Sequence, residues 1–499
     1  MPLRRTALAL AGLLVVPSAP VRSQQLTDHP KVRQALALVQ TWLEGESAYE
    51  QIPGVSAAIV HDQQTLWSGG FGYADPARRT PATASTVYSI CSISKLFTSV
   101  ALMRLRDEGK LRLDDPVAKH LSWFAIKQTY PDAPDITVEG LLTHASGLPR
   151  ESDYPYWSGP DFRFPTHEQI VARLKEQATL YPPETYFQYS NLGLTLAGEI
   201  VAAEAGQPYA EYVRRTVLQP LGLTSTTPEM PAALRGTRLA VGYTALRRDG
   251  TRQPVPFFQA NGIAPAAGYA STADDLARFA QWQFRLLAKG GEEVLRANTL
   301  REMQRVHFID PDWQTTWGLG FSVWHDGDKT FVGHGGSCPG YRTQLMLHPR
   351  SKIAAVFMAN ASGVNSGLFT QRMYDIVGPA VTAALADSGK ATTAPDTALR
   401  KYVGSYSDAP WGGETAVLVW DDGLALLGLP TTDPMKALTK FRRVAGEPHT
   451  FRRIRSDGTL GEAIRFELGA DGRAVRYWQD SNPSPRIEVG PRPGQKAAP

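Results

Sequence analysis

The sequence predicts an antiparallel α/β domain followed by a small all-β domain. Strand-like segments occur near residue 60 and again between residues 315 and 360, and apolar residues recur at helical spacing between the two groups. Short polar turns join the strands within each group, which favours an antiparallel sheet and disfavours a βαβ nucleotide-binding fold. A sheet built from both ends of the domain, flanked by helices from its middle, is therefore expected.

The N-terminus reads as a signal peptide covering residues 1–23. It combines Arg4-Arg5, an apolar segment from Ala7 to Val16, and small residues before Gln24. The apolar segment is shorter than the roughly 20 residues that span a bilayer, which makes a membrane anchor the weaker alternative. The arginine pair also allows export by the twin-arginine route. We expect an exported protein, periplasmic or secreted.

Charge and composition exclude several classes of partner. The net charge of +4 falls to +1 when the three arginines of the predicted signal peptide are removed, so no nucleic-acid partner is implied. Clusters of His, Cys, Asp or Glu at metal-ligand spacing are absent from the sequence, and we expect neither a metal nor an organic cofactor. No integral membrane partner is implied.

The predicted elements of the first domain follow in chain order. Residues 55–61 and 64–70 form a hairpin around Asp62-Gln63. Apolar residues after Ser92 recur at helical spacing until Gly109, so Ser92 lies at the start of a helix. Further predicted elements are helices over 167–178 and 192–205, a helix opened by a capping box from Ser271 to Asp274, and strands over 317–324, 330–333, 341–347 and 353–358.

A small, polar segment separates the two predicted domains. Residues 386–398 have the composition of a linker, so the first domain covers 24–385. Short alternating segments punctuated by Asp-Gly pairs then extend over 399–495. They predict a β-rich barrel or sandwich.

Three motifs carry the candidate chemistry. In Ser92-Ile93-Ser94-Lys95, an amine lies three residues after a hydroxyl on one helical face, where the amine can accept the hydroxyl's proton. Tyr189-Ser190-Asn191 precedes the helix at 192, and its tyrosine and asparagine can relay a proton and orient an amide. His334-Gly335-Gly336-Ser337 lies on a predicted strand whose glycines leave room for a substrate backbone.

The order Ser-x-x-Lys, Tyr-x-Asn, His-x-Gly resembles the motif pattern of class C β-lactamases and related carboxypeptidases and esterases. The segments 141–148 and 268–276 resemble two further family segments, so the resemblance covers roughly 50–380. It implies a β-lactamase/transpeptidase-like sheet and a penicillin-binding-protein-like site. It also implies a small-molecule or peptide substrate with a scissile carbonyl, of which cell-wall peptide is one example.

The resemblance implies a role for each motif residue. Ser92 would be the nucleophile, with Lys95 and Tyr189 handling protons, and either of the latter could be the base. The backbone N–H groups of Ser92 and Ser337 would hold the oxyanion, and Asn191, His334 and Gly336 would line the substrate site. No Gly-x-Ser-x-Gly motif occurs, which sets aside an α/β-hydrolase.

Two positions depart from the family pattern. His334 replaces the lysine of many β-lactamases, and a histidine is largely neutral at pH 7, which suits peptidases and esterases at least as well. Glu184 stands where relatives often have glycine. His144 is interpreted as a structural residue that satisfies backbone groups.

The resemblance also suggests a disulfide. Cys91 precedes the nucleophile and Cys338 follows Gly336 by two residues, a placement that resembles the disulfide of some class A carbapenem-hydrolysing β-lactamases. If the strand flanks the helix start, the two cysteines adjoin, and export favours oxidation. The alternative is a pair of small buried apolar residues.

The motifs leave the substrate open. An amidase or peptidase on D-amino-acid peptides, an esterase and a β-lactamase all fit. A rival function is a sensor or cell-wall-binding protein that β-lactams acylate with little turnover. Tyr154, Tyr156 and Trp157 fit either a pocket for an apolar acyl group or the core.

Overall fold

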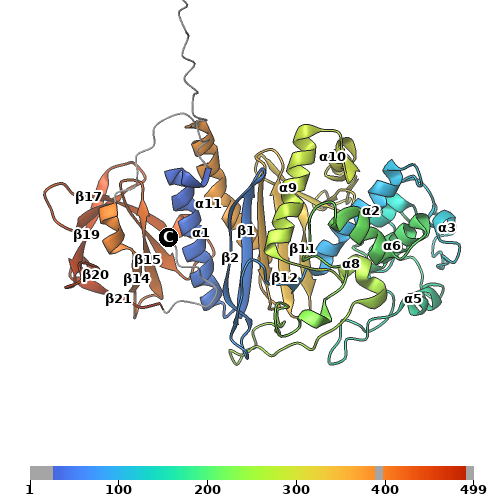
Figure 1. Ribbon diagram of the computed structural model, residues 1–499, viewed down its shortest axis with the longest axis horizontal. Helices are drawn as coiled ribbons and strands as arrows, with labels where there is room; N and C mark the ends of the chain where they lie inside the picture. Colours follow the sequence, from blue (N-terminus) through green and yellow to red (C-terminus); the bar gives the residue numbers. More distant parts are fainter. Residues whose placement is uncertain (1–25, 388–396, 490–499) are drawn as a thin grey trace, which may run out of the picture.

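The computed structural model describes residues 26–387 and 397–489. The predicted signal peptide and most of the predicted linker lie outside these residues. In the described part, a large sheet with helices on both faces is followed by a separate β-barrel (Figure 1). This arrangement confirms the predicted fold class.

The sheet has nine strands in the order β3-β2-β1-β13-β12-β11-β10-β9-β8, and all neighbours are antiparallel. Its two halves meet where β1 pairs with β13, so the N-terminal hairpin joins the strands from the end of the domain as predicted. The strands are β1 (Gly54–His61), β2 (Gln64–Asp75), β3 (Thr80–Pro81), β8 (Phe308–Ile309), β9 (Thr316–Trp317), β10 (Ser322–Asp326), β11 (Lys329–Cys338), β12 (Tyr341–His348) and β13 (Ile353–Ala359).

Both faces of the central strands are buried. Along β1, Ala58 and Val60 point into the core on one face of the sheet, whereas Val55, Ala57 and Ile59 point into the core on the opposite face. The helices of the first face are α2 (Ser94–Asp107), α6 (Asn191–Ala205), α8 (Ala264–Ala267) and α9 (Ala273–Lys289). The opposite face packs against α1 (Pro30–Tyr49) and α11 (Ser366–Ala386).

Two local predictions were wrong. The segment 317–324 is not one strand, because it bends sharply between β9 and β10. Gly320 has a φ of +80°, and a Cβ there would lie 1.9 Å from the Ser99 hydroxyl on α2. The cap of α9 is Thr272, whose side chain accepts the N–H of Asp275, rather than the predicted Ser271.

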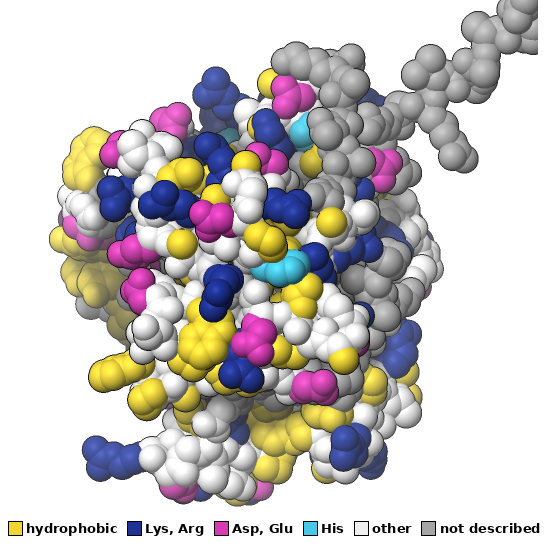
Figure 2. All heavy atoms as spheres, turned by 90° about the vertical axis from the view of Figure 1, so that its left-hand side faces the viewer, with side chains coloured by type: hydrophobic (Ala, Val, Ile, Leu, Met, Phe, Trp, Pro, Cys, Tyr) yellow, Lys and Arg dark blue, Asp and Glu magenta, His cyan; other side chains and the backbone are white. Residues whose placement is uncertain are grey.

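The C-terminal domain is a closed barrel of strands β14 to β21, from Gly404–Ser407 to Asn482–Ile487. It packs on α1, where the Trp42 indole donates to the Thr431 carbonyl at 2.8 Å. The α1 and α11 helices therefore lie between the sheet and the barrel (Figure 1). From the barrel side, basic and acidic side chains are interspersed without a large area of one sign (Figure 2).

The remaining barrel strands are β15 (Glu414–Trp420), β16 (Gly423–Leu429), β17 (Leu438–Arg443), β18 (Thr450–Ile454), β19 (Leu460–Leu468) and β20 (Ala474–Gln479). Two short helices, α4 (Val138–Thr143) and α5 (His167–Leu174), lie between α2 and α6 in the chain. Within the described residues, no helix is long and apolar enough to cross a membrane.

Candidate active site

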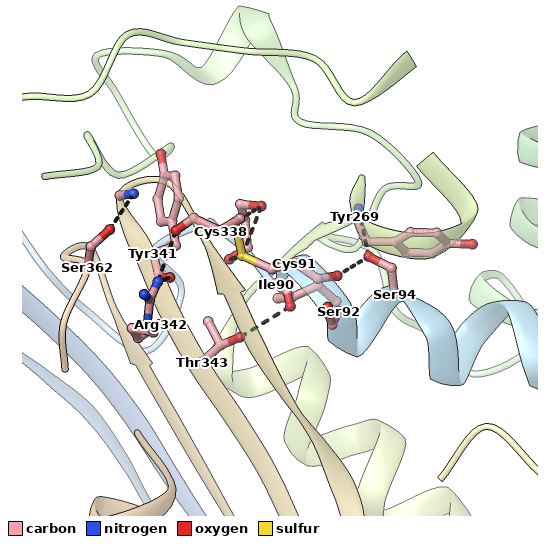
Figure 3. Close-up of a disulfide and its surroundings, with 12 residues drawn as sticks. Ile90, Cys91, Ser92, Ser94, Tyr269, Cys338, Tyr341, Arg342, Thr343 and Ser362 are labelled. Carbon is pink, nitrogen blue, oxygen red and sulfur yellow. Dashed lines mark hydrogen bonds between the residues drawn. A yellow bond between two sulfur atoms is a disulfide. The ribbon is translucent and has the colours of Figure 1, made fainter. Parts of the chain in front are cut away.

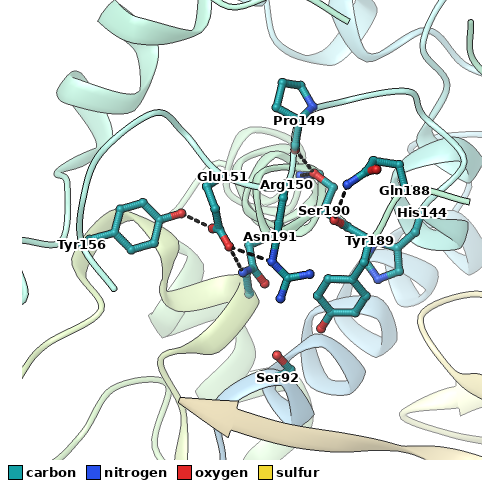
Figure 4. Close-up of polar contacts among 12 residues, drawn as sticks. Ser92, His144, Pro149, Arg150, Glu151, Tyr156, Gln188, Tyr189, Ser190 and Asn191 are labelled. Carbon is teal, nitrogen blue, oxygen red and sulfur yellow. Dashed lines mark hydrogen bonds and ion pairs between the residues drawn. The ribbon is translucent and has the colours of Figure 1, made fainter. Parts of the chain in front are cut away.

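Ser92 lies in a single 3-10 turn, Cys91–Ile93, that leads directly into α2. The preceding Cys91 has a φ of +48°, an uncommon conformation for a residue other than glycine. Such strained backbone concentrates at functional sites. The Ser92 side chain is half-buried and faces Tyr189 (Figure 4).

Lys95 is fully buried on the first turn of α2. Its Nζ lies 3.3 Å from the Ser92 hydroxyl, 2.7 Å from the Oδ1 of Asn191 and 2.8 Å from the carbonyl oxygen of Ala266. None of these contacts is with a carboxylate. The buried amine of Lys95 therefore has three uncharged hydrogen-bond partners.

Burial lowers the pKa of Lys95 well below its ordinary value of 10.5, and the charge of Arg150 adds to the shift while Glu151 opposes it. The two carbonyl-type oxygens can only accept, so in the neutral form of Lys95 they take the two N–H groups of the amine. The remaining lone pair then faces the Ser92 hydroxyl. This geometry lets Lys95 accept the proton of Ser92.

Tyr189 points its hydroxyl toward Ser92 from the loop before α6 (Figure 4). Burial raises its pKa above the ordinary value of 10.0, and the interaction with Ser92 and the charge of Arg150 oppose the shift only in part. Its ring lies 4.8 Å from the Nζ of Lys95. The pKa values of the two groups are thus shifted in opposite directions, which favours Lys95 over Tyr189 as the proton acceptor.

Asn191, the first residue of α6, is oriented by Glu151, a residue that the sequence analysis did not single out. The amide Nδ2 donates to the Oε1 of Glu151 at 2.7 Å, which leaves Oδ1 facing Lys95. The other oxygen of Glu151 accepts the hydroxyl of Tyr156. The side chains of Tyr156, Glu151 and Asn191 thus form a continuous hydrogen-bonded support for Lys95 (Figure 4).

The three aromatic residues after Glu151 divide between core and surface. Tyr156 is fully buried and packs against Trp157 and Phe164, as the core interpretation requires. Tyr154 lines a surface cleft with Phe162 and Phe257. Trp157 is half-buried and packs against the same core as Tyr156.

His144 has the structural role that the sequence analysis assigned to it. Its Nδ1 accepts the backbone N–H of Ser190 at 3.1 Å, and its ring centroid lies 4.3 Å from that of Tyr189. The residue ends α4 with a φ of +60°. His144 therefore fixes the backbone and ring of the Tyr189 segment.

His334 is buried on β11, with its ring 5.5 Å from Trp317 and 6.1 Å from Tyr189. Its Nδ1 lies 2.6 Å from the Gly335 carbonyl, an acceptor, so Nδ1 carries the hydrogen and Nε2 a free lone pair. Burial is the main cause that lowers its pKa to about 3, and Lys95 adds to this shift only when its amine is protonated. His334 is therefore neutral and presents no cation.

Gly336 lets β11 approach the nucleophile segment. A Cβ at this position would lie 2.3 Å from the carbonyl oxygen of Ile90 and 2.1 Å from the Thr343 hydroxyl. The sequence analysis attributed the glycine to space for substrate, but the close neighbour is the protein's own backbone. Ser337 follows on an exposed part of the strand.

A disulfide joins Cys91 to Cys338, with their Cα atoms 5.7 Å apart and a sequence separation of 247 (Figure 3). Ser92 follows one cysteine and Ser337 precedes the other. The bridge therefore holds the two backbone N–H groups assigned to the oxyanion in the same region.

Replacing both cysteines with serine is expected to lower the free energy of unfolding by about 2–5 kcal/mol, because the bridge closes a long loop in the unfolded chain. Urea denaturation of the oxidised protein and of the Cys91→Ser/Cys338→Ser variant measures this difference. An unchanged free energy of unfolding would show that the bridge does not stabilise the fold.

The family model described as β-lactamase matches residues 39–377, which include all three motifs. The chain belongs to the β-lactamase family. The fold and the order of the motifs agree with this assignment, and the predicted family resemblance is confirmed. Family members and structural neighbours are hydrolases of this fold.

Three relatives illustrate the range of the family. "Beta-lactamase-like protein 2" of Dictyostelium discoideum is 26% identical over 83% of this chain and 78% of its own length. The octameric penicillin-binding protein homologue from Pyrococcus abyssi has a TM-score of 0.61 at 26% identity, covering 90% of this chain and 99% of that one. The D-amino acid amidase from Ochrobactrum anthropi SV3 has a TM-score of 0.57 at 26% identity, covering 71% and 99%.

Proposed function

We propose that the protein is a serine hydrolase that forms an acyl-enzyme on Ser92 and cleaves an amide or ester. The observation that carries the proposal is the environment of Lys95: a fully buried amine, bound by two carbonyl-type oxygens and placed 3.3 Å from the Ser92 hydroxyl. An amine held neutral in this way is a general base for the adjacent hydroxyl.

The proposed reaction has two steps. Lys95 accepts the proton of Ser92 as its oxygen attacks the carbonyl, and the N–H groups of Ser92 and Ser337 bind the oxyanion. Tyr189 donates its proton to the leaving group and regains one from Lys95. Water then attacks the ester on Ser92 and gives a proton to Lys95. Lys95 passes this proton to the departing Ser92 oxygen, so that the acid is released and the Ser92 hydroxyl and the neutral Lys95 are restored.

The environment of His334 favours an amide or ester substrate that places no carboxylate beside β11. Its ring is neutral, and its Nε2 is buried without a hydrogen-bond partner among the described residues, so His334 cannot neutralise an anion. The relative from Ochrobactrum anthropi, named as a D-amino acid amidase, supports amides of D-amino acids as a class to test. β-Lactams, which carry a carboxylate, fit this side of the site less well.

Intact mass and turnover distinguish the proposed hydrolase from a β-lactam sensor. We expect steady hydrolysis of 4-nitrophenyl butyrate or D-phenylalanine amide, and mass spectra with at most a transient acyl adduct. A stable penicillin adduct without turnover of any ester or amide would support the sensor. No adduct with a fluorophosphonate would contradict the assignment of a serine nucleophile.

We also propose that the protein acts after export. The Cys91–Cys338 disulfide supports this proposal, since structural disulfides persist mainly in oxidising compartments. Fractionation of cells expressing the full chain should recover a shortened, oxidised protein outside the cytoplasm. Recovery of the full-length, reduced chain in the cytoplasm would contradict export.

A further inference from the structure

Arg150 places a permanent positive charge at the active site, where none of the three motifs supplies one. Lys95 and His334 are both buried with lowered pKa values. The Arg150 side chain is 58% exposed, and its guanidinium lies between Asn191 and the Tyr189 ring, on the side of Ser92 (Figure 4). It is thus the cation that a substrate would meet among the site residues described above.

The position of Arg150 is fixed by the protein. Its backbone carbonyl accepts the N–H groups of Asn191 and Leu192 at 2.8 and 3.2 Å, which ties the loop after α4 to the start of α6. The guanidinium carbon lies 4.9 Å from the centre of the Tyr189 ring. A guanidinium stacked on an aromatic ring keeps its plane while its edge remains available.

Only part of the hydrogen-bonding edge of the Arg150 guanidinium has a partner in the protein. Its Nε lies 3.3 Å from the Oε1 of Glu151, an oxygen that already accepts the amide of Asn191. Within residues 26–387 and 397–489, the two terminal nitrogens of Arg150 have no hydrogen-bond partner. A carboxylate can accept from both of these nitrogens at once, a geometry that arginine favours.

We propose that Arg150 binds a carboxylate of the substrate, on the wall of the site opposite β11. This inference rests on the proposed function and refines it: the preferred substrate is an anionic ester or amide. Its carboxylate lies toward the loop after α4 and not toward His334. The cation that many β-lactamases carry on the strand is here supplied from the other side.

Three activated esters test the proposal. They are 4-nitrophenyl butyrate, which is neutral, mono-4-nitrophenyl glutarate, with a carboxylate on the acyl group, and 3-carboxy-4-nitrophenyl butyrate, with a carboxylate on the leaving group. We expect the enzyme to prefer one carboxylate ester. For that ester, Arg150→Gln should lower kcat/KM at least about tenfold, mainly through KM, because a charge-assisted pair is lost.

The neutral ester separates binding from effects on catalysis. On the pH plateau, where the contribution of Arg150 to the pKa of Lys95 no longer affects the rate, Arg150→Gln should lower kcat/KM for the neutral ester much less than for the anionic ester. Arg150→Lys should restore part of the preference for the anionic ester. Arg112→Gln is the matched control, because Arg112 is 73% exposed and pairs with Asp114 on the surface. It should behave as wild type with all three esters.

Two outcomes would overturn the inference. Equal losses with all three esters would mean that Arg150 acts through Lys95 rather than on the substrate, and no loss with any ester would mean that it does not contact the substrate. In both cases the wild-type enzyme still hydrolyses the esters. Failure of the wild type to hydrolyse any of them would instead contradict the proposed function.

Discussion

Replacing Ser92 with alanine is expected to lower kcat/KM for an activated ester by about 10⁴-fold or more, since no acyl-enzyme can form without the hydroxyl. The side chain is half-buried and its hydroxyl contacts Lys95 at 3.3 Å, whereas Lys95 keeps its bonds to Asn191 and Ala266 in the variant. The melting temperature should therefore change little. Steady-state kinetics measure the loss of kcat/KM, and thermal unfolding measures the change in melting temperature.

Ser99→Ala is the matched control for this substitution. Ser99 is buried on the same helix, and its hydroxyl has no hydrogen-bond partner among the described residues. The control should retain activity within about twofold, as expected for a substitution that removes no interaction with the reacting groups. A Ser92→Ala variant with more than a tenth of wild-type activity would exclude Ser92 as the nucleophile.

Lys95→Met is expected to lower kcat/KM by about 10²–10⁴-fold, the usual contribution of a general base. Methionine fills a similar volume without a proton acceptor. The variant also leaves the oxygens of Asn191 and Ala266 without their donor, which should cost about 1–3 kcal/mol of stability. Kinetics should be measured well below the melting temperature of the variant, so that unfolding does not contribute.

Lys119→Met controls for the loss of a lysine elsewhere. Lys119 is 56% exposed and pairs with Asp115. It should keep wild-type kinetics, because its amine pairs with Asp115 and contacts none of the site residues described above. Wild-type acylation of Ser92 in folded Lys95→Met protein would show that another group takes the proton.

Much of the site was predictable because each motif has a spacing that carries chemistry. A lysine three residues after a serine reaches it on any helix, so Ser92 and Lys95 could be paired from the sequence alone. The placement of Tyr189 opposite them depends on the tertiary fold. It was predicted only through the family resemblance.

Glu151 and Arg150 were missed because their roles arise from contacts across the fold. Glu151 meets Asn191 from a loop 40 residues away in the chain, and no local spacing predicts that contact. The base was also undecidable from the sequence. Burial lowers the pKa of Lys95 and raises that of Tyr189, and burial of both side chains follows from the packing of α2 and α6.

Errors in the fold came from steric constraints that the sequence does not display. Gly320 breaks a segment of strand-like composition, because α2 leaves no room for a Cβ at that position. The helix α1 was not predicted, although Val32, Leu36, Val39 and Leu43 recur at helical spacing and pack together in one core. The spacing of these four residues is a sufficient signal for this helix.

The pH dependence of the rate of Ser92 acylation tests the central claim most directly, that neutral Lys95 is the base. The base must be deprotonated, so the rate rises with pH through its pKa and then levels off. Burial lowers the pKa of Lys95 well below 10.5 and raises that of Tyr189 above 10.0. A single-turnover rate that reaches its plateau well below pH 10 is the predicted result. A rate that continues to rise tenfold per pH unit beyond pH 10 would contradict the account and assign the proton to Tyr189.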